Sequence, residues 1–144
     1  MTQGRVLGID YGERRVGISM SDESRLFAQT LTTIQRKRDG DPQVILALHQ
    51  LISAHTITEI VIGWPLRLNG REGIQTQKVS RFIDLLAPSQ LPVHKWDERW
   101  STLSADRALT EGRVRGVERR QKVDQVAAVI ILQGWLDAQR LLLS

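Results

Sequence analysis

Four carboxylate residues stand at positions that hydrophobic patterning alone does not explain. Asp10 ends the apolar run VLGI, Asp97 and Glu98 directly follow the run PVHKW, and Asp124 lies near the start of the apolar stretch VDQVAAVIIL. Taken singly, each has a structural explanation: a turn cap, a surface loop residue, or an acid in the first turn of a helix. However, two of these sites lie just past predicted strands, and the third lies near the beginning of a helix on the same sheet. We therefore expect the carboxylates to converge.

Converging carboxylates repel one another and raise one another's pKa unless a cation lies among them. Magnesium suits such a site because it prefers oxygen ligands and needs only one or two protein carboxylates beside phosphate oxygens. Cysteine is absent, and the histidines at 49, 55 and 94 are too scattered for a zinc site. One or two magnesium ions, with manganese as a substitute, could activate a water and stabilise the leaving oxygen of a phosphodiester. The choice between Asp97 and Glu98 stays open, because strand alternation points neighbouring side chains to opposite faces.

Basic residues give the chain a net charge of +4 and gather in three stretches. In DYGERRVG, Gly12 lets the backbone turn and Arg14 and Arg15 lie beside it, a weak phosphate-loop signal better interpreted as the hinge of a hairpin. We interpret the cluster at 36–38 as a solvated loop. The third stretch lies before and at the start of the last predicted helix, and we expect it to bind the phosphates of a nucleic acid. Its basic residues are Arg113, Arg115, Arg119, Arg120 and Lys122.

The elements that must position these residues alternate between strands and helices. Short connections separate three apolar runs, at 5–10, 15–21 and 26–34, and this predicts antiparallel strands. Two more strands are predicted at 59–63 and 92–96. Helices are predicted at 41–55, about 72–87, from Ser101 or Thr102 to about Gly112, and about 121–139. The order β-β-β-α-β-α-β-α-α predicts an α/β fold whose ligands collect beyond the carboxyl ends of the strands, where Asp10 would lie.

The chain is 144 residues long and 41% hydrophobic, which suits one compact domain. Its N-terminal stretch lacks the apolar core and cleavage site of a signal peptide. The longest unbroken apolar run, VAAVIIL at 126–132, is far shorter than the roughly 20 residues that cross a bilayer. We therefore expect a cytoplasmic protein that does not associate with membranes.

The sequence closely resembles the YqgF family, the Holliday-junction-resolvase-like proteins also described as pre-16S rRNA nucleases. Four motifs in the family's order carry the resemblance: GIDYGERRVGIS at 8–19, IGWPLRLNGREG at 62–73, DERWST at 97–102 and KVDQVAAVIILQ at 122–133. The resemblance implies the ribonuclease H-like fold, with one nuclease domain over residues 1–144. That fold has a five-stranded mixed sheet, its first three strands antiparallel, with helices on both faces.

The resemblance also implies roles for individual residues. Asp10, Glu98 and Asp124 would form the catalytic, metal-binding acidic triad. Gly63 and Pro65 would hold a loop beside the site. Asp97 and Arg99 occupy the flanking positions of the DER motif, and Arg99 would be among the residues that contact nucleic acid.

Our leading hypothesis is a magnesium-dependent endonuclease that trims the 5′ end of precursor 16S rRNA during ribosome biogenesis. A resolvase of four-way DNA junctions would use the same fold and acids, but would need two active sites and hence a dimer. The sequence leaves the choice between monomer and homodimer open. A non-catalytic RNA-binding module is a third alternative. A sugar-kinase or Hsp70-type ATPase is disfavoured because those proteins close two such domains around the nucleotide. The four tryptophans could stack on bases, but we expect core packing to need most of them.

Overall fold

A mixed five-stranded sheet forms the centre of the computed structural model, which describes residues 4–37, 40–100 and 116–143, with the backbone alone at 100, 116–124 and 143. The strands are β1 (Arg5–Tyr11), β2 (Arg15–Ser21), β3 (Ala28–Gln35), β4 (Ile57–Trp64) and β5 (Val93–Asp97). Their order across the sheet is β3-β2-β1-β4-β5. The first three strands pair antiparallel, whereas β1–β4 and β4–β5 pair parallel. The predicted sheet is thereby confirmed.

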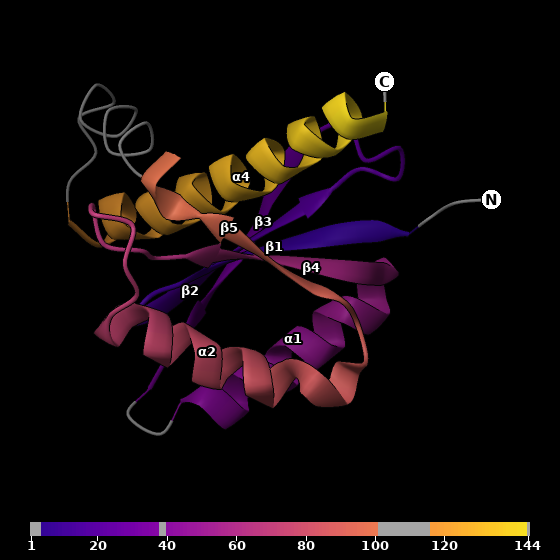
Figure 1. The fold of residues 1–144 in the computed structure, drawn as a ribbon. Helices are drawn as coiled ribbons and strands as arrows, with labels where there is room; N and C mark the ends of the chain where they lie inside the picture. Colours follow the sequence, from indigo (N-terminus) through magenta and orange to yellow (C-terminus); the bar gives the residue numbers. More distant parts are fainter. Residues whose placement is uncertain (1–3, 38–39, 101–115, 144) are drawn as a thin grey trace.

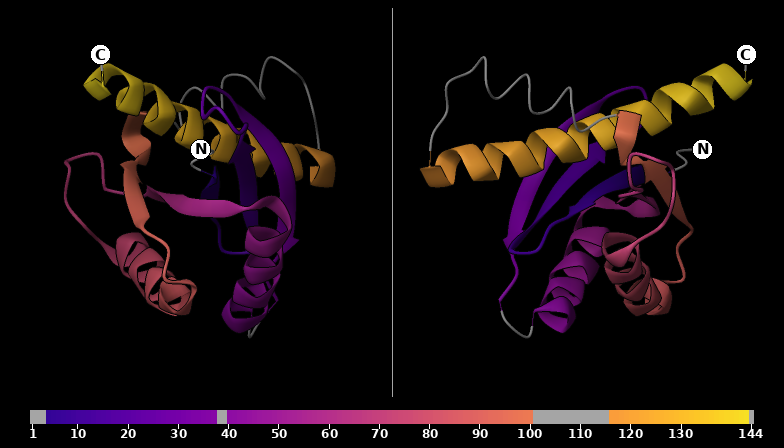
Figure 2. Two further views of the ribbon diagram at one scale, coloured as in Figure 1. Left: turned by 90° about the vertical axis from the view of Figure 1, so that its right-hand side faces the viewer. Right: turned by 60° about the vertical axis from the view of Figure 1, so that its left-hand side comes forward.

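Helices cover both faces of the sheet (Figure 1). Helices α1 (Asp41–His55) and α2 (Ile74–Leu86) lie on one face, and α4 (Gly116–Leu143) crosses the other. Figure 2 shows the same three layers from two further sides. Two single turns of 3₁₀ helix, η1 (Ala87–Ser89) and η2 (Glu98–Trp100), flank β5. The predicted helix from Ser101 or Thr102 to Gly112 lies outside the described residues.

The central strand β1 is apolar on both faces because a hydrophobic layer covers each of them. Leu7 and Ile9 pack with residues of α1 and α2, whereas Val6 packs with residues of α4. Side chains alternate between the faces of a strand. The even-numbered residues of β1 therefore face α4, and the odd-numbered residues face α1 and α2.

Three of the four tryptophans serve in core packing, as expected. Trp64 and Trp135 are each 8% exposed, and Trp96 packs against the cluster below α4. Only the backbone of Trp100 is described. Within the described residues, no helix is long and apolar enough to span a membrane.

Candidate active site

Three parallel strands end at the same edge of the sheet, and Asp10, Asp97 and Glu98 lie at that edge. Asp10 follows the last residue of β1 that pairs with β4. Glu98 begins the 3₁₀ turn directly after β5, whose Trp96 pairs with Gly63 of β4. The topology thus brings Asp10 and Glu98 together from distant parts of the sequence.

Asp10 and Glu98 are in direct contact. By the alternation along β1, the side chain of Asp10 faces α4, and it forms a hydrogen bond with the Glu98 side chain. Burial raises the pKa of Glu98, the hydrogen bond with Asp10 opposes that rise, and the nearby charge of Asp97 adds to it. Two carboxyl groups this close need a shared proton or a cation between them.

Gly63 makes room for the Glu98 carboxylate. A Cβ atom built on Gly63 would lie 2.3 Å from Glu98 Oε1 and 2.8 Å from Ile131 Cδ1. Neither distance occurs in real packing, so any side chain at position 63 would have to move the carboxylate. The glycine of the GWP motif is therefore explained by the space that Glu98 occupies. Pro65 follows β4 and begins the loop that leads to α2.

Asp97 is engaged elsewhere. Its carboxylate accepts bonds from Arg99 Nε at 2.9 Å and from Arg99 Nη2 at 2.6 Å, and also from the Arg99 backbone N–H at 3.0 Å. The guanidinium of Arg99 holds the pKa of Asp97 below its usual range. Of the two acids left open by the sequence, only Glu98 is seen in contact with Asp10.

The start of α4 crosses the sheet near the level of Asp10. Gln125 Nε2 donates to Thr33 Oγ1 at 3.2 Å, and Thr33 lies in register with Gly17, which in turn pairs with Asp10. Asp124 directly precedes Gln125 in this helix. Its backbone therefore lies near the start of α4, next to the residue that contacts β3, and its side chain is outside the described set.

The donor chemistry of this edge fits magnesium, because Asp10 and Glu98 offer carboxylate oxygens. Among the side chains that the structure describes, no three acids or histidines form a metal-binding group. Asp124, the third member of the predicted triad, is not among those side chains.

The hairpin turn after β1 carries the first predicted basic residues. Gly12 N–H donates to the Arg15 carbonyl at 3.0 Å, and a Cβ on Gly12 would lie 2.5 Å from that oxygen. Arg14 and Arg15 line a shallow hollow of about 210 Å³ at this turn. Of the predicted basic stretch before the last helix, Arg113 and Arg115 lie outside the described residues. Arg119, Arg120 and Lys122 lie in the first turns of α4, where only the backbone is described.

On the opposite face of the sheet, Tyr11 fixes the end of β1 to α1. Its hydroxyl donates to both carboxylate oxygens of Asp41, at 2.8 and 2.9 Å. Arg36 donates to Asp41 Oδ1 at 2.7 Å and to the Glu13 carbonyl at 2.8 Å. The interpretation of the 36–38 cluster as a solvated loop is therefore wrong for Arg36. This residue forms an ion pair with Asp41, the first residue of α1.

Tyr11 is the only tyrosine of the chain, so its ionisation can be followed by ultraviolet absorbance. Burial, the hydrogen bond to Asp41 and the charge of Asp41 together raise the pKa of Tyr11 from 10.0 to about 12. The neutral phenol is favoured in the folded state, so this contribution to stability is complete below pH 10 and is lost as pH rises through about 12. We expect Asp41→Asn to lower the pKa of Tyr11 toward 10, and exposed Asp84→Asn to leave it unchanged. An unchanged value in Asp41→Asn would contradict the hydrogen bond.

The model of the RuvX family, described as Holliday junction resolvase, matches residues 4–138. This chain belongs to the RuvX family. RuvX is the family named YqgF above, so the resemblance drawn from the four motifs is confirmed.

Relatives of this RuvX protein are similar over nearly their whole length. A protein of Syntrophus aciditrophicus named "Putative pre-16S rRNA nuclease" is 46% identical over 135 residues, covering 93% of this chain and 89% of the relative. A protein of Myxococcus xanthus with the same name is 43% identical over 140 residues, covering 94% and 89%. The family consists of nucleases and resolvases, so this RuvX protein is a hydrolase of phosphodiester bonds.

Solved structures confirm the ribonuclease H-like fold. RuvC of T. thermophilus in complex with a Holliday junction substrate has a TM-score of 0.63 at 11% identity, covering 96% of each chain. The yeast mitochondrial Holliday junction resolvase Ydc2 has a TM-score of 0.59 at 15% identity, covering 95% of this chain and 79% of the other. At such low identity, these neighbours establish the fold alone.

Proposed function

We propose that this RuvX protein is a magnesium-dependent endonuclease that trims the 5′ end of precursor 16S rRNA during ribosome biogenesis, and therefore acts in the cytoplasm. The observation that carries the proposal is the contact between Asp10 and Glu98 at the carboxyl ends of β1 and β5. Two carboxylates in contact at the edge of the sheet repel each other, and a cation bound by a nuclease would compensate that repulsion. A purely structural site would leave it uncompensated.

Asp10, Glu98 and Asp124 would hold one or two magnesium ions, and manganese could substitute. Bound there, the cation would supply an activated water and stabilisation of the leaving oxygen. Glu98 is preferred to Asp97 as a ligand because Arg99 already neutralises Asp97. Gly63 positions Glu98: because glycine has no Cβ, the Glu98 carboxylate has room to approach Asp10.

Basic residues would bind the nucleic-acid backbone on either side of the reacting phosphate. Arg14 and Arg15 of the hairpin turn are placed close to Asp10 by the chain itself. We propose that the stretch before and at the start of α4 contributes further contacts. Its members are Arg113, Arg115, Arg119, Arg120 and Lys122. Arg99 would also contribute when a substrate phosphate replaces Asp97 as its partner. Such contacts give affinity without sequence preference.

RNA is the favoured substrate because the relatives at 46% and 43% identity are named for pre-16S rRNA. A second candidate is a four-way DNA junction. The description of the family and the complex formed by T. thermophilus RuvC both favour it. This alternative would require a homodimer that cuts two strands symmetrically, whereas a monomer suffices for RNA trimming.

A side-by-side assay separates the two candidates. Purified protein is incubated with the 5′ leader of precursor 16S rRNA and with a DNA four-way junction, each with magnesium, and products are resolved by length. We expect the RNA to be cut at a defined position and the junction to be cut much more slowly. Symmetrical cutting of the junction with intact RNA would instead establish a resolvase, and its oligomeric state should then be dimeric.

A further inference from the structure

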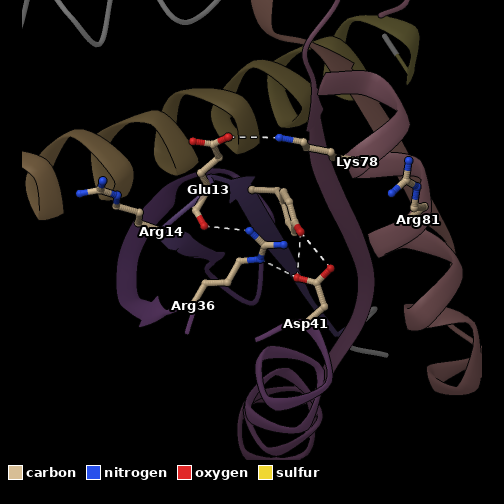
Figure 3. A pocket seen from close by; sticks show the side chains of 7 residues that line it. Glu13, Arg14, Arg36, Asp41, Lys78 and Arg81 are labelled. Atoms are coloured by element: carbon tan, nitrogen blue, oxygen red, sulfur yellow. Dashed lines mark hydrogen bonds and ion pairs between the residues drawn. The ribbon is translucent and has the colours of Figure 1, made fainter. Parts of the chain in front are cut away.

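A basic pocket of about 340 Å³ lies at the carboxyl end of β1 (Figure 3). Tyr11 lines it and packs on the α1 and α2 side of the sheet, opposite to the side that Asp10 faces. It is formed where the hairpin turn after β1, the end of β3, the start of α1 and the outer face of α2 meet. Four basic and two acidic side chains line it: Arg14, Arg36, Lys78, Arg81, Glu13 and Asp41. The lining therefore carries an excess of two positive charges.

Both acids of the pocket already have cationic partners. Asp41 accepts bonds from Tyr11 and from Arg36, whose Nε lies 2.7 Å from Oδ1. Glu13 pairs with Lys78 at 3.1 Å, and this bond lowers the pKa of Glu13. Neither carboxylate is therefore an uncompensated charge that would repel an anion.

The excess charge is carried by Arg14 and Arg81. Both side chains are exposed, and within the described part of the chain neither forms an ion pair. Figure 3 shows them on opposite sides of the pocket, with Glu13, Arg36 and Asp41 between them. Both arginines line the pocket. A guanidinium group suits a phosphate group, since it can donate two parallel bonds to the phosphate oxygens.

Tyr11 is the aromatic residue that lines the pocket, and its ring is already in contact with neighbouring side chains. One face of the Tyr11 ring contacts Phe82, with ring centroids 4.5 Å apart, and the Arg36 guanidinium lies over the ring at 5.1 Å. A nucleobase needs an open aromatic face to stack. The pocket is therefore suited to the backbone of a nucleic acid and not to its bases.

We propose that this pocket binds a backbone phosphate of the nucleic-acid substrate, held between Arg14 and Arg81. The proposal rests on the proposed function. Tyr11 directly follows Asp10 in β1, and the two side chains point to opposite faces of the sheet. A strand that passes over the carboxyl end of β1 would therefore place one phosphate at the acids and another, a few nucleotides away, in the pocket. Contact at two points would fix the direction of the substrate across the site.

Binding is tested in an Asp10→Asn background, so that substrate stays intact. The affinity for the 16S leader is measured as a function of salt for this protein and for a form that also carries Arg14→Ala and Arg81→Ala. We expect the added substitutions to weaken binding roughly tenfold and to reduce the log–log salt slope by about 1, the loss of one phosphate contact. Arg140→Ala is the matched control, because Arg140 pairs with Asp137 near the distant end of α4. An unchanged slope, or an equal loss in the control, would overturn the proposal.

The single tyrosine gives a local reporter of occupancy. Isotope-labelled Tyr11 is observed by NMR in the Asp10→Asn protein while RNA or inorganic phosphate is added. We expect its ring signals to shift with RNA, and to stay in place when Arg14 and Arg81 are both alanine. A shift with inorganic phosphate but not with RNA would identify a small free anion as the ligand and refute the proposal, as would no shift at all.

Failure of this proposal is distinguishable from failure of the proposed function. If wild-type protein cuts no RNA but Tyr11 still responds to it, the pocket is a binding site and the nuclease proposal is wrong. If RNA is cut while Tyr11 and the salt slope stay unchanged, the nuclease proposal stands and the pocket is not used. Because both arginines are exposed, the double substitution should leave thermal stability nearly unchanged.

Discussion

Asp10→Asn should reduce RNA cleavage about a thousandfold while leaving RNA affinity nearly unchanged. The substitution keeps the size of the side chain but removes the charge that would hold a cation beside Glu98. Several kcal/mol of transition-state stabilisation are expected to be lost, and each 1.36 kcal/mol corresponds to a factor of ten in rate. Single-turnover cleavage of the 16S leader with saturating protein measures the effect without a contribution from binding.

Asp97→Asn is the matched control for Asp10→Asn. It removes an acid one residue from Glu98, but one whose carboxylate is paired with Arg99. We expect at most a modest loss of cleavage from it. If Asp97→Asn were as inactive as Asp10→Asn while Glu98→Gln kept its activity, the assignment of Glu98 over Asp97 would be wrong.

Gly63→Ala should reduce cleavage about a hundredfold with little loss of fold stability. The new Cβ would lie 2.3 Å from Glu98 Oε1, so the carboxylate must swing away from Asp10. Displacement of a reacting group by about 1 Å can cost a factor of about 100 in rate. The clashing atoms are the ends of two flexible side chains, Glu98 and Ile131, and so the backbone can stay in place. Cleavage rates and thermal unfolding of the same samples separate the two effects.

A second substitution distinguishes this displacement from general damage. Glu98→Asp shortens the acid by one methylene group and should recover part of the activity when combined with Gly63→Ala. The same substitution in the wild-type background should reduce activity, since the shorter acid no longer reaches Asp10. Full activity of Gly63→Ala alone would show that Glu98 is not where the reaction takes place.

Much of the fold could be predicted because local patterns and topology agree. Helix α1 and strand β2 have the predicted bounds, 41–55 and 15–21. Strand β3 was predicted from Leu26 but begins at Ala28, because Asp22 Oδ1 accepts the backbone N–H groups of Leu26 and Phe27 and holds them in a turn. Helix α4 is longer than predicted at both ends. Its start was missed because Glu118, Arg119 and Arg120 show no apolar periodicity in sequence.

The candidate site was only partly predictable. Carboxylates placed just after strands indicated the edge where Asp10 and Glu98 meet, because parallel strands end together. The sequence could not separate Asp97 from Glu98, since that choice depends on the turn after β5 and on the position of Arg99. The basic pocket had no signal in sequence, because Arg14, Arg36 and Arg81 come from three separate segments. Only their meeting in the fold makes them a candidate site.

The most direct measurement of the central claim is the rate at which wild-type protein cuts the 16S leader as divalent cation is removed and returned. After treatment with a chelator, we predict that cleavage stops, that magnesium restores it, and that manganese does so as well. Asp10→Asn should stay inactive at every cation concentration. Undiminished cleavage in the presence of the chelator would contradict a metal-dependent reaction at Asp10 and Glu98.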